Sequence, residues 1–366
     1  MANELIDSPN VWQAETLRGD QSWIFELSDG ARRDLVSTVD AIYDPERPLL
    51  DYRLGEADLD SAWPTIEAAV REAYFGCGVA IVKGLPRAAL DESRFGLLSW
   101  CIGLRIGVAR PQGKATQYLS DVRDAGVNYR ASTGRGFSSN AGLDFHADGA
   151  DLTTLACYNA AQSGGQSLIT SSSAAWNRLV QTQPELSDVL REPYSFSRQG
   201  EQAADETAHY AQPVVDFADG RLFMKWNRNR IQSAQKLEGA PPLSDAQYDA
   251  VEALDAIVRS PEFAYTMYLE PGDLQIMNNL DILHSRTEFI DHEAPEAKRL
   301  LHRLWLAPPN SVRMPDSWIK FYRSVKPGTV RGGIRGHQYD ASCQAFDARQ
   351  ATAHDMTIID HPDGAI

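Results

Sequence analysis

Residues 263–306 consist of short apolar segments separated by turns, and this succession limits the folds open to the chain more than any other feature. Two of the segments, 263–269 and 274–277, flank the turn Pro271-Gly272-Asp273, and we expect them to form paired strands. Residues 298–306 are expected to form another strand. Many short strands with few helices between them are typical of a sandwich or jelly roll rather than of alternating βαβ units. The sequence therefore predicts a mainly β fold with flanking helices.

Helices are expected where apolar residues recur with a helical period. These stretches run from Asp60 to just before Gly76 and over residues 91–103, 173–181 and 245–259. The last is preceded by Ser244, three residues before Gln247, which is the spacing of a capping box. The chain is expected to divide into an N-terminal arm or small appended sheet (1–58), a main domain (59–310) and a C-terminal extension packed on the core (311–366).

The charge balance argues against polyanionic partners. Lysine and arginine total 35 against 50 for aspartate and glutamate, which gives a formal net charge of −15. Such a protein repels nucleic acid and anionic membrane surfaces, so its basic residues must act at individual positions. We therefore expect a small-molecule partner, with no nucleic acid and no membrane. Association into a homo-oligomer stays open.

Nothing in the sequence indicates export or a membrane span. The N-terminus lacks a basic region followed by an apolar core, and no window approaches the roughly 18 apolar residues that a spanning helix needs. The four cysteines are widely scattered and include no C-x-x-C pair, so we expect reduced thiols. The protein is accordingly expected to be cytoplasmic.

A candidate metal site begins at His146 and Asp148, within the stretch 143–149, which we expect to be a strand. Alternate side chains of a strand share a face, so the two would project together, roughly 6–7 Å apart at the backbone. An isolated H-x-D more often has no metal, but a third ligand is offered by His284, which follows a strongly apolar segment. Two histidines and one carboxylate form the facial triad that leaves open positions on a non-haem Fe(II) ion.

The expected strand 298–306 carries a second signal. Alternation places Arg299, Leu301, Arg303 and Trp305 on one face, and leucines with His302 on the other. Two guanidinium groups on a strand that is apolar on both faces are unfavourable unless they meet anions. One such anion is the far carboxylate of a 2-oxo acid, whose decarboxylation supplies electrons for oxygen chemistry at iron. The alternative is a pair of structural salt bridges to internal carboxylates.

Four motifs in order give the chain a family resemblance. H-x-D, then G-G-x-[ST] at 164–167, then N-N-x-x-x-x-H-x-R at 278–286, then R-x-x-x-R at 299–303 resembles the TauD/TfdA family of Fe(II)/2-oxoglutarate-dependent oxygenases. The similarity covers roughly residues 60–310. It implies a double-stranded β-helix, the jelly-roll core also found in cupins. It also implies Fe(II) as cofactor, 2-oxoglutarate as co-substrate and O2 as oxidant.

The resemblance also implies roles for individual residues. The implied iron ligands are His146, Asp148 and His284. Arg299 matches the arginine that grips the C5 carboxylate of 2-oxoglutarate, and Ser167 matches the hydroxyl that helps it. Arg303 matches an arginine that in several members holds the acidic group of the prime substrate, which indicates a substrate with a carboxylate or similar group. The residues expected to support the site beside the distal histidine are Asn279 and Arg286.

We therefore expect an oxygenase that couples 2-oxoglutarate decarboxylation to C–H oxidation of a small anionic or amino-acid-like metabolite. Hydroxylation is favoured, with desaturation and ring formation left open, and the carboxylate at Asp148 argues against chlorination. The polar loop 123–142 is a candidate lid. One alternative is a cupin-like metal isomerase or hydrolase, which has no need for Arg299. Another is a jelly-roll binding protein without activity.

Overall fold

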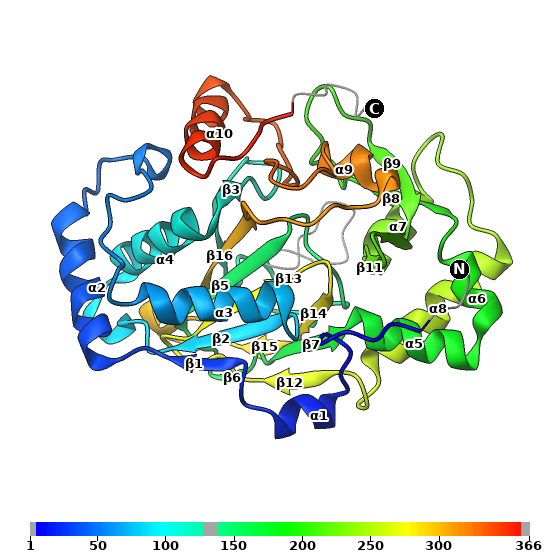
Figure 1. Ribbon diagram of the computed structural model, residues 1–366, viewed down its shortest axis with the longest axis horizontal. Coiled ribbons are helices and arrows are strands. Elements are labelled where there is room, and N and C mark those ends of the chain that lie inside the picture. The colour runs from blue at the N-terminus through cyan, green and yellow to red at the C-terminus, as the bar shows by residue number, and fades with distance from the viewer. Residues whose placement is uncertain (1–4, 127–137, 360–366) are drawn as a thin grey trace.

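The computed structural model describes residues 5–126 and 138–359. Its largest sheet has seven strands, joined by antiparallel pairing except for one parallel pair, β1 with β2. Six of them lie in the order β1 (Ile24–Glu26), β2 (Val79–Lys83), β13 (Leu274–Asn278), β5 (Leu152–Asn159), β16 (Leu300–Ala307) and β3 (Val108–Arg110), and β4 (Leu119–Val122) also pairs with β16. We call this the main sheet (Figure 1).

A second sheet of three antiparallel strands packs against the main sheet. Its order is β12 (Tyr265–Met267), β7 (Ser167–Ser171) and β14 (Ile282–Arg286). Three two-stranded ribbons complete the strands: β6 (Ser163–Gly164) with β15 (Phe289–Ile290), β8 (Pro193–Ser197) with β9 (His209–Pro213), and β10 (Val215–Ala218) with β11 (Arg221–Met224). Two facing sheets with flanking helices are the predicted jelly-roll architecture.

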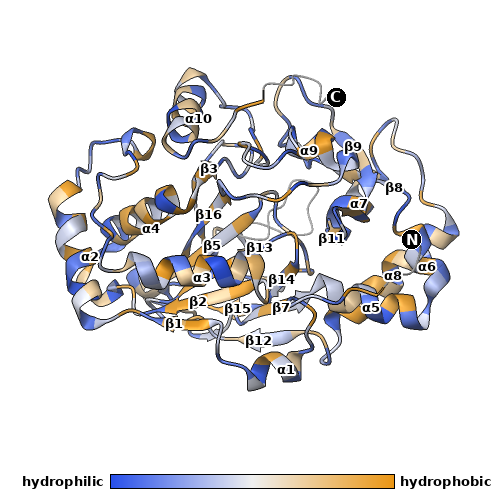
Figure 2. Cartoon of the chain, viewed as in Figure 1, coloured by the Kyte–Doolittle hydropathy of each residue, from blue (hydrophilic) through white to orange (hydrophobic). Residues whose placement is uncertain are grey.

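Alternation along β2 shows how the two layers are held. Val79 and Ile81 point between the sheets and join a cluster with Ile169 and Ile282 of the second sheet. Ala80 and Val82, on the other face of β2, belong to a larger cluster that includes residues of three helices. These helices are α2 (Asp29–Ile42), α3 (Trp63–Phe75) and α4 (Glu92–Ile106). Figure 2 shows hydrophobic residues in α4 and the central strands, and both hydrophobic and hydrophilic residues along the outer helices, as expected for helices with one buried face.

The remaining helices surround the other faces (Figure 1). They are α1 (Ala14–Gly19), α5 (Ser172–Thr182), α6 (Pro184–Val189), α7 (Arg228–Ala234), α8 (Asp245–Arg259), α9 (Ile319–Tyr322) and α10 (Ala341–Ala353), with short 3-10 turns at Leu49–Asp51, Arg87–Ala89, Pro295–Ala297 and Asp316–Trp318. The capping box predicted before α8 is confirmed, because Ser244 and Gln247 each bond the other's backbone N–H. The four predicted helical stretches correspond to α3, α4, α5 and α8.

The predicted pairing of 263–269 with 274–277 is wrong. β12 pairs with β7 in the second sheet, whereas β13 pairs with β2 and β5 in the main sheet. The turn between them carries the chain from one sheet to the other, and Gly272 takes a positive φ of 95° there, with its N–H bonded to the carbonyl of Cys157. A tight turn in sequence therefore does not make a hairpin in this fold.

The two ends of the chain contribute to the same cores. β1 of the N-terminal segment extends the main sheet, and Cys343 and Phe346 of α10 join the cluster under α2–α4. The predicted division at 58 and 310 stays a prediction. Most of the predicted loop 123–142 falls on residues 127–137, outside the described residues. Within the described ranges no helix is both long and apolar enough to cross a bilayer.

A fully buried ion pair ties the C-terminal extension to the bend that precedes β5. Arg331 donates from Nε to Oδ2 of Asp151 at 3.0 Å and from Nη2 to Oδ1 at 2.5 Å, and neither side chain is exposed. The hydroxyl of Tyr74 donates to the same carboxylate at 3.0 Å. A bidentate arrangement with a further hydrogen bond is the geometry in which a buried pair offsets its desolvation.

We expect Arg331→Met to lower the free energy of unfolding by about 3–5 kcal/mol, because it leaves Asp151 as a buried, unpaired carboxylate. Chemical denaturation of the full chain measures the change. The matched control is Arg313→Met, which breaks an exposed pair with Asp316 and is expected to change stability by about 0–1 kcal/mol. Equal effects of the two substitutions would contradict the assigned role of the buried pair.

Candidate active site

The H-x-D motif lies in an extended segment that precedes β5. The predicted strand over 143–149 is wrong: His146 makes isolated bridges to Asn227 and His284, and residues 149–151 bend before β5 begins. His146 and His284 exchange backbone hydrogen bonds of 2.9 Å in both directions. A directly opposed antiparallel pair places both imidazoles on one side of the backbone. The segment is therefore held against β14 without belonging to a sheet.

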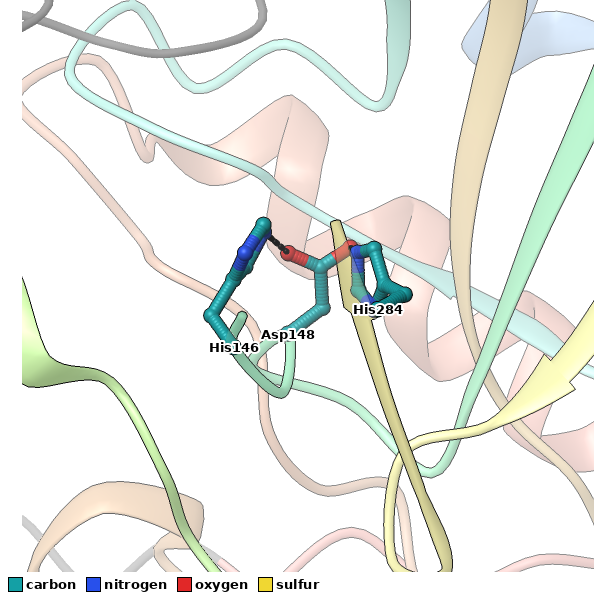
Figure 3. A group of neighbouring side chains, drawn as sticks. All are labelled: His146, Asp148 and His284. Carbon is teal, nitrogen blue, oxygen red and sulfur yellow. Dashed lines mark ion pairs between the residues drawn. The ribbon is translucent and has the colours of Figure 1, made fainter. Parts of the chain in front are cut away.

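The three predicted metal ligands converge, as Figure 3 shows. The carboxylate of Asp148 lies between the imidazoles, with Oδ1 3.8 Å from Nε2 of His146 and Oδ2 3.6 Å from Nε2 of His284. One ligand atom from each residue lies within 4.8 Å of the others. In the described part of the chain this is the one such group of three or more histidine, cysteine or acidic residues. The arrangement fits a single metal ion held by two nitrogens and one oxygen.

The protonation states suit metal binding. The Nδ1 atom of His146 lies 2.9 Å from the carbonyl oxygen of Asp144, which holds the tautomer that leaves Nε2 free for a metal. Burial and the neighbouring imidazole lower the pKa of His284 to about 3, so its ring is neutral. Burial opposes ionisation of Asp148, but the positive charge of Arg303, the two adjacent imidazoles and the hydrogen bond from Trp305 outweigh it and hold the pKa well below its usual range.

Asp148 is fixed by neighbours on three sides. Trp305 donates from Nε1 to Oδ2 at 2.8 Å, and the hydroxyl of Thr153 donates to the same oxygen at 3.1 Å. Asn279 accepts a hydrogen bond from the Asp148 N–H at 3.2 Å and donates to Thr153 at 2.9 Å, so it supports both the backbone of Asp148 and the hydroxyl that bonds its carboxylate. Arg286 lies further out and donates to the carbonyl groups of residues 139 and 141, both at 2.6 Å.

The metal group opens into a pocket along the inner face of β16. Arg299, Leu301, Arg303 and Trp305 all line it. On the opposite face the leucines at 300, 304 and 306 enter the core under α4. The predicted alternation along this strand is confirmed.

Arg299 lies in a largely apolar part of the pocket. It is 6 % exposed, and its guanidinium donates from Nη1 to the carbonyl of Val122 at 3.3 Å. The guanidinium forms no ion pair within 4.0 Å in residues 5–126 and 138–359, although the backbone N–H of Arg299 donates to Oδ1 of Asp291 at 2.8 Å. Burial lowers its pKa to about 10. Ser167, also buried, lines the same pocket and donates to Gln275 at 3.3 Å. Leu155 and Leu301 pack beside Val122. A buried guanidinium without an ion-pair partner is energetically unfavourable, so this position suits the carboxylate of a ligand.

Arg303 has partners inside the chain. Nη1 lies 3.6 Å from Oδ2 of Asp148, and Nε donates to Oε1 of Gln112 at 2.8 Å. The sequence left open whether this arginine meets an incoming anion or an internal one. It already faces the metal-ligating carboxylate, and its contact with substrate stays a prediction.

Lys225 is a pocket residue that sequence reasoning missed. It is 3 % exposed, donates to the backbone carbonyl of Asp148 at 2.6 Å, and lies 4.6 Å from the ring centre of Phe321 and 5.3 Å from that of Tyr322. Burial and the charge of Arg230 lower its pKa to about 7, against the raising effect of Asp148. The signal was a lysine inside the apolar run 222–226.

Comparison with known families decides the assignment of the chain. The model of the "Taurine catabolism dioxygenase TauD, TfdA family" matches residues 47–305. The protein belongs to the TauD/TfdA family. The family match ends at Trp305, so the C-terminal residues Phe321 and Ile334 that line the pocket lie beyond it.

Individual family relatives span most of the chain. FR-33289 synthase of Streptomyces rubellomurinus is 24% identical over 321 residues, which cover 86% of this chain and 95% of that protein. Among solved structures, asparagine oxygenase in complex with Fe(II), hydroxyasparagine and succinate has a TM-score of 0.57 at 17% identity, covering 78% of this chain and 93% of that one. The oxygenase OrfP with Fe and alpha-ketoglutaric acid has a TM-score of 0.54 at 13% identity, covering 78% and 94%. These structures share the jelly-roll fold.

Proposed function

We propose that this protein is an Fe(II)- and 2-oxoglutarate-dependent oxygenase that hydroxylates a C–H bond of a small, anionic or amino-acid-like metabolite. The observation that carries the proposal is the pairing, in one pocket, of the His146–Asp148–His284 group with the unpaired buried cation of Arg299. A cupin-like isomerase or hydrolase would use the metal group, but it would not require a buried arginine in the same pocket. A binding protein without activity would require neither the metal group nor Arg299.

The donor set fits the metal and the co-substrate. Two neutral imidazoles and one carboxylate suit Fe(II) and leave coordination positions open. When bound, Fe(II) and 2-oxoglutarate activate O2, so that one oxygen atom enters the substrate C–H bond and the other enters succinate, with release of CO2. A planar guanidinium at Arg299 suits the far carboxylate of 2-oxoglutarate, with Ser167 as a second donor.

The chain's own residues orient and shield these reactants. Trp305 and Thr153 hold the Asp148 carboxylate in one orientation, and Arg303 compensates its charge. Leu155 and Leu301 exclude water from the region around Arg299, which strengthens its attraction for a carboxylate. These residues position the co-substrate without moving a proton.

The substrate class rests on the basic lining of the pocket and on the relatives. One solved structure with this fold contains hydroxyasparagine, an amino acid, and others contain arginine derivatives. Of the described aspartate, glutamate, lysine and arginine side chains that line the pocket, all but Asp148 are basic, although the protein as a whole is acidic, which favours a substrate with an acidic group. The sequence predicts Arg303 as the partner of that group, although Asp148 and Gln112 already contact its guanidinium.

The test is substrate-stimulated formation of succinate. Purified protein with Fe(II), 2-oxoglutarate and O2 is incubated with a panel of amino acids and small organic acids, and succinate and oxidised product are measured together. We expect at least one panel member to raise succinate formation above the basal rate, with one product molecule for each succinate. The control omits Fe(II) or 2-oxoglutarate.

Two results would contradict the proposal. If 2-oxoglutarate does not bind to the metal-loaded protein, the isomerase or hydrolase alternative is favoured. If Fe(II) itself does not bind, the protein is a jelly-roll binding protein. A panel without any stimulation, combined with binding of both Fe(II) and 2-oxoglutarate, would exclude the tested substrates only.

A further inference from the structure

Within the described residues, the pocket is lined by more basic side chains than form ion pairs with carboxylates. Five basic side chains line it: Lys225, Arg230, Arg286, Arg299 and Arg303. Arg230 lies 3.0 Å from a carboxylate oxygen of Glu201, and Arg303 lies 3.6 Å from one of Asp148. Arg286 donates two hydrogen bonds to backbone carbonyl oxygens. Lys225 and Arg299 remain. In the part of the chain that the structure describes, neither the Lys225 ammonium nor the Arg299 guanidinium forms an ion pair within 4.0 Å, although the backbone N–H of Arg299 donates to Asp291.

These two cations belong to different parts of the pocket. Arg299 lies beside Val122 and shares the largely apolar region around Ser167 with it. Lys225 instead lies against Phe321 and Tyr322 of the C-terminal extension. Two basic side chains in separate parts of one buried pocket suit two anionic groups. The co-substrate supplies only one of them at Arg299 in the proposed function.

We propose that Lys225 is the anion-binding residue for the prime substrate, whose carboxylate, sulfonate or similar oxyanion group it contacts. The inference rests on the proposed function and extends it. Lys225 is held beside the metal group, because its ammonium donates to the carbonyl of Asp148 and the N–H of Ala147 bonds to the carbonyl of Trp226. An oxyanion on Lys225 would therefore be fixed close to the metal, which orients the rest of the substrate.

Two further observations point to a ligand here. Among the described residues, the hydrogen-bond acceptors for the buried Lys225 side chain are the Asp148 carbonyl and, at 3.4 Å, the hydroxyl of Tyr322, and it forms no ion pair with a carboxylate. Tyr210 also lines the pocket, and its buried hydroxyl has no hydrogen-bond partner in the described residues. Its ring packs on Phe321, with centroids 5.3 Å apart. A hydroxyl and an ammonium near one aromatic wall suit an oxyanion with several acceptor atoms.

Arg303 is less suited to this task than the sequence indicated. Its guanidinium already shares its charge with Asp148 and bonds to Gln112. An arriving anion would have to compete with the metal-ligating carboxylate for it. Lys225 has no such competitor among the described residues, which is why the structure assigns the substrate's anion to the lysine.

Selenate, an oxyanion with an anomalous X-ray signal, tests the inference without knowledge of the substrate. The full-length protein is crystallised with Mn(II) in place of Fe(II) and with 2-oxoglutarate, which occupies Arg299, and is then soaked in sodium selenate. We expect an anomalous peak within hydrogen-bonding distance of Lys225 Nζ. In solution, Lys225→Met should weaken selenate binding at least about tenfold, as measured by calorimetry on the same Mn(II)- and 2-oxoglutarate-loaded protein.

The matched control is Lys236→Met, which removes the same charge from an exposed position and should leave selenate binding unchanged. Selenate bound at Arg303, at the protein surface only, or nowhere in the wild-type crystal would overturn the inference. The wild-type crystal decides the question even if Lys225→Met does not fold. Failure of Mn(II) or 2-oxoglutarate to occupy the triad and Arg299 would instead contradict the proposed function, so the two failures are distinguishable.

Discussion

Replacing His284 by alanine should abolish turnover and lower the affinity for Fe(II) by more than about 100-fold, since even residues that only support a ligand can have effects of that size. The imidazole is buried on β14 and neutral, with its Nε2 facing Asp148. Its loss leaves a site with one nitrogen and one oxygen from the chain. His146→Ala should behave in the same way. Metal binding to the purified apoprotein and succinate formation at saturating iron measure the two effects.

The control for this prediction is His292→Ala, which removes a partly exposed histidine outside the ligand group. It should retain wild-type iron affinity and activity. Wild-type turnover of either His146→Ala or His284→Ala, at the iron level that saturates the wild type, would show that another residue completes the site. Asp148→Ala tests the carboxylate separately and should also stop hydroxylation.

The metal group was predictable because its pattern does not depend on exact secondary structure. Residues at i and i+2 of any extended backbone project to one side, so His146 and Asp148 meet although their segment is not a strand. His284 was found by its position after an apolar run. Its backbone pairing with His146 is a contact between distant parts of the chain, and local periodicity does not specify such contacts.

The faces of β16 were predictable, but the partners of its side chains were not. Period-two alternation fixes which residues of a strand share a face, and both Arg299 and Arg303 line the pocket accordingly. Which of them meets an internal anion depends on Asp148 and Gln112, which come from elsewhere in the sequence. The sequence pattern does not distinguish Arg299 from Arg303, whereas in the structure only Arg303 forms an ion pair with Asp148.

The missed features have a common physical cause. The apolar run around Lys225 marks the position but does not specify what its side chain contacts, because Phe321 and Tyr322 come from a distant part of the sequence. Likewise, the turn at Gly272 resembles a hairpin turn, yet the strands on its two sides belong to different sheets. In both cases the outcome depends on packing between segments far apart in sequence.

Arg299→Ala should raise the requirement for 2-oxoglutarate by about two orders of magnitude or more, because removing one partner of a desolvated, charged pair typically loses 2–5 kcal/mol. The guanidinium is 6 % exposed and has no internal carboxylate in the described ranges, so the co-substrate has no competitor for it. Titration of 2-oxoglutarate into the metal-loaded protein and the apparent KM for succinate formation measure the change. Metal affinity should be unaffected, since Arg299 does not contact the triad residues.

Two companion variants separate charge from geometry at this position. Arg299→Lys keeps the charge but loses the planar pair of donors, so it should restore only part of the affinity. Ser167→Ala removes a single hydrogen bond, worth about 1 kcal/mol, and should weaken 2-oxoglutarate binding only several-fold. If Arg299→Ala keeps the wild-type dependence on 2-oxoglutarate, the co-substrate's carboxylate must lie at Arg303 or Arg286. The apolar region around Val122 and Leu301 would then have to accept a neutral part of a ligand, and its buried arginine would remain without an explanation.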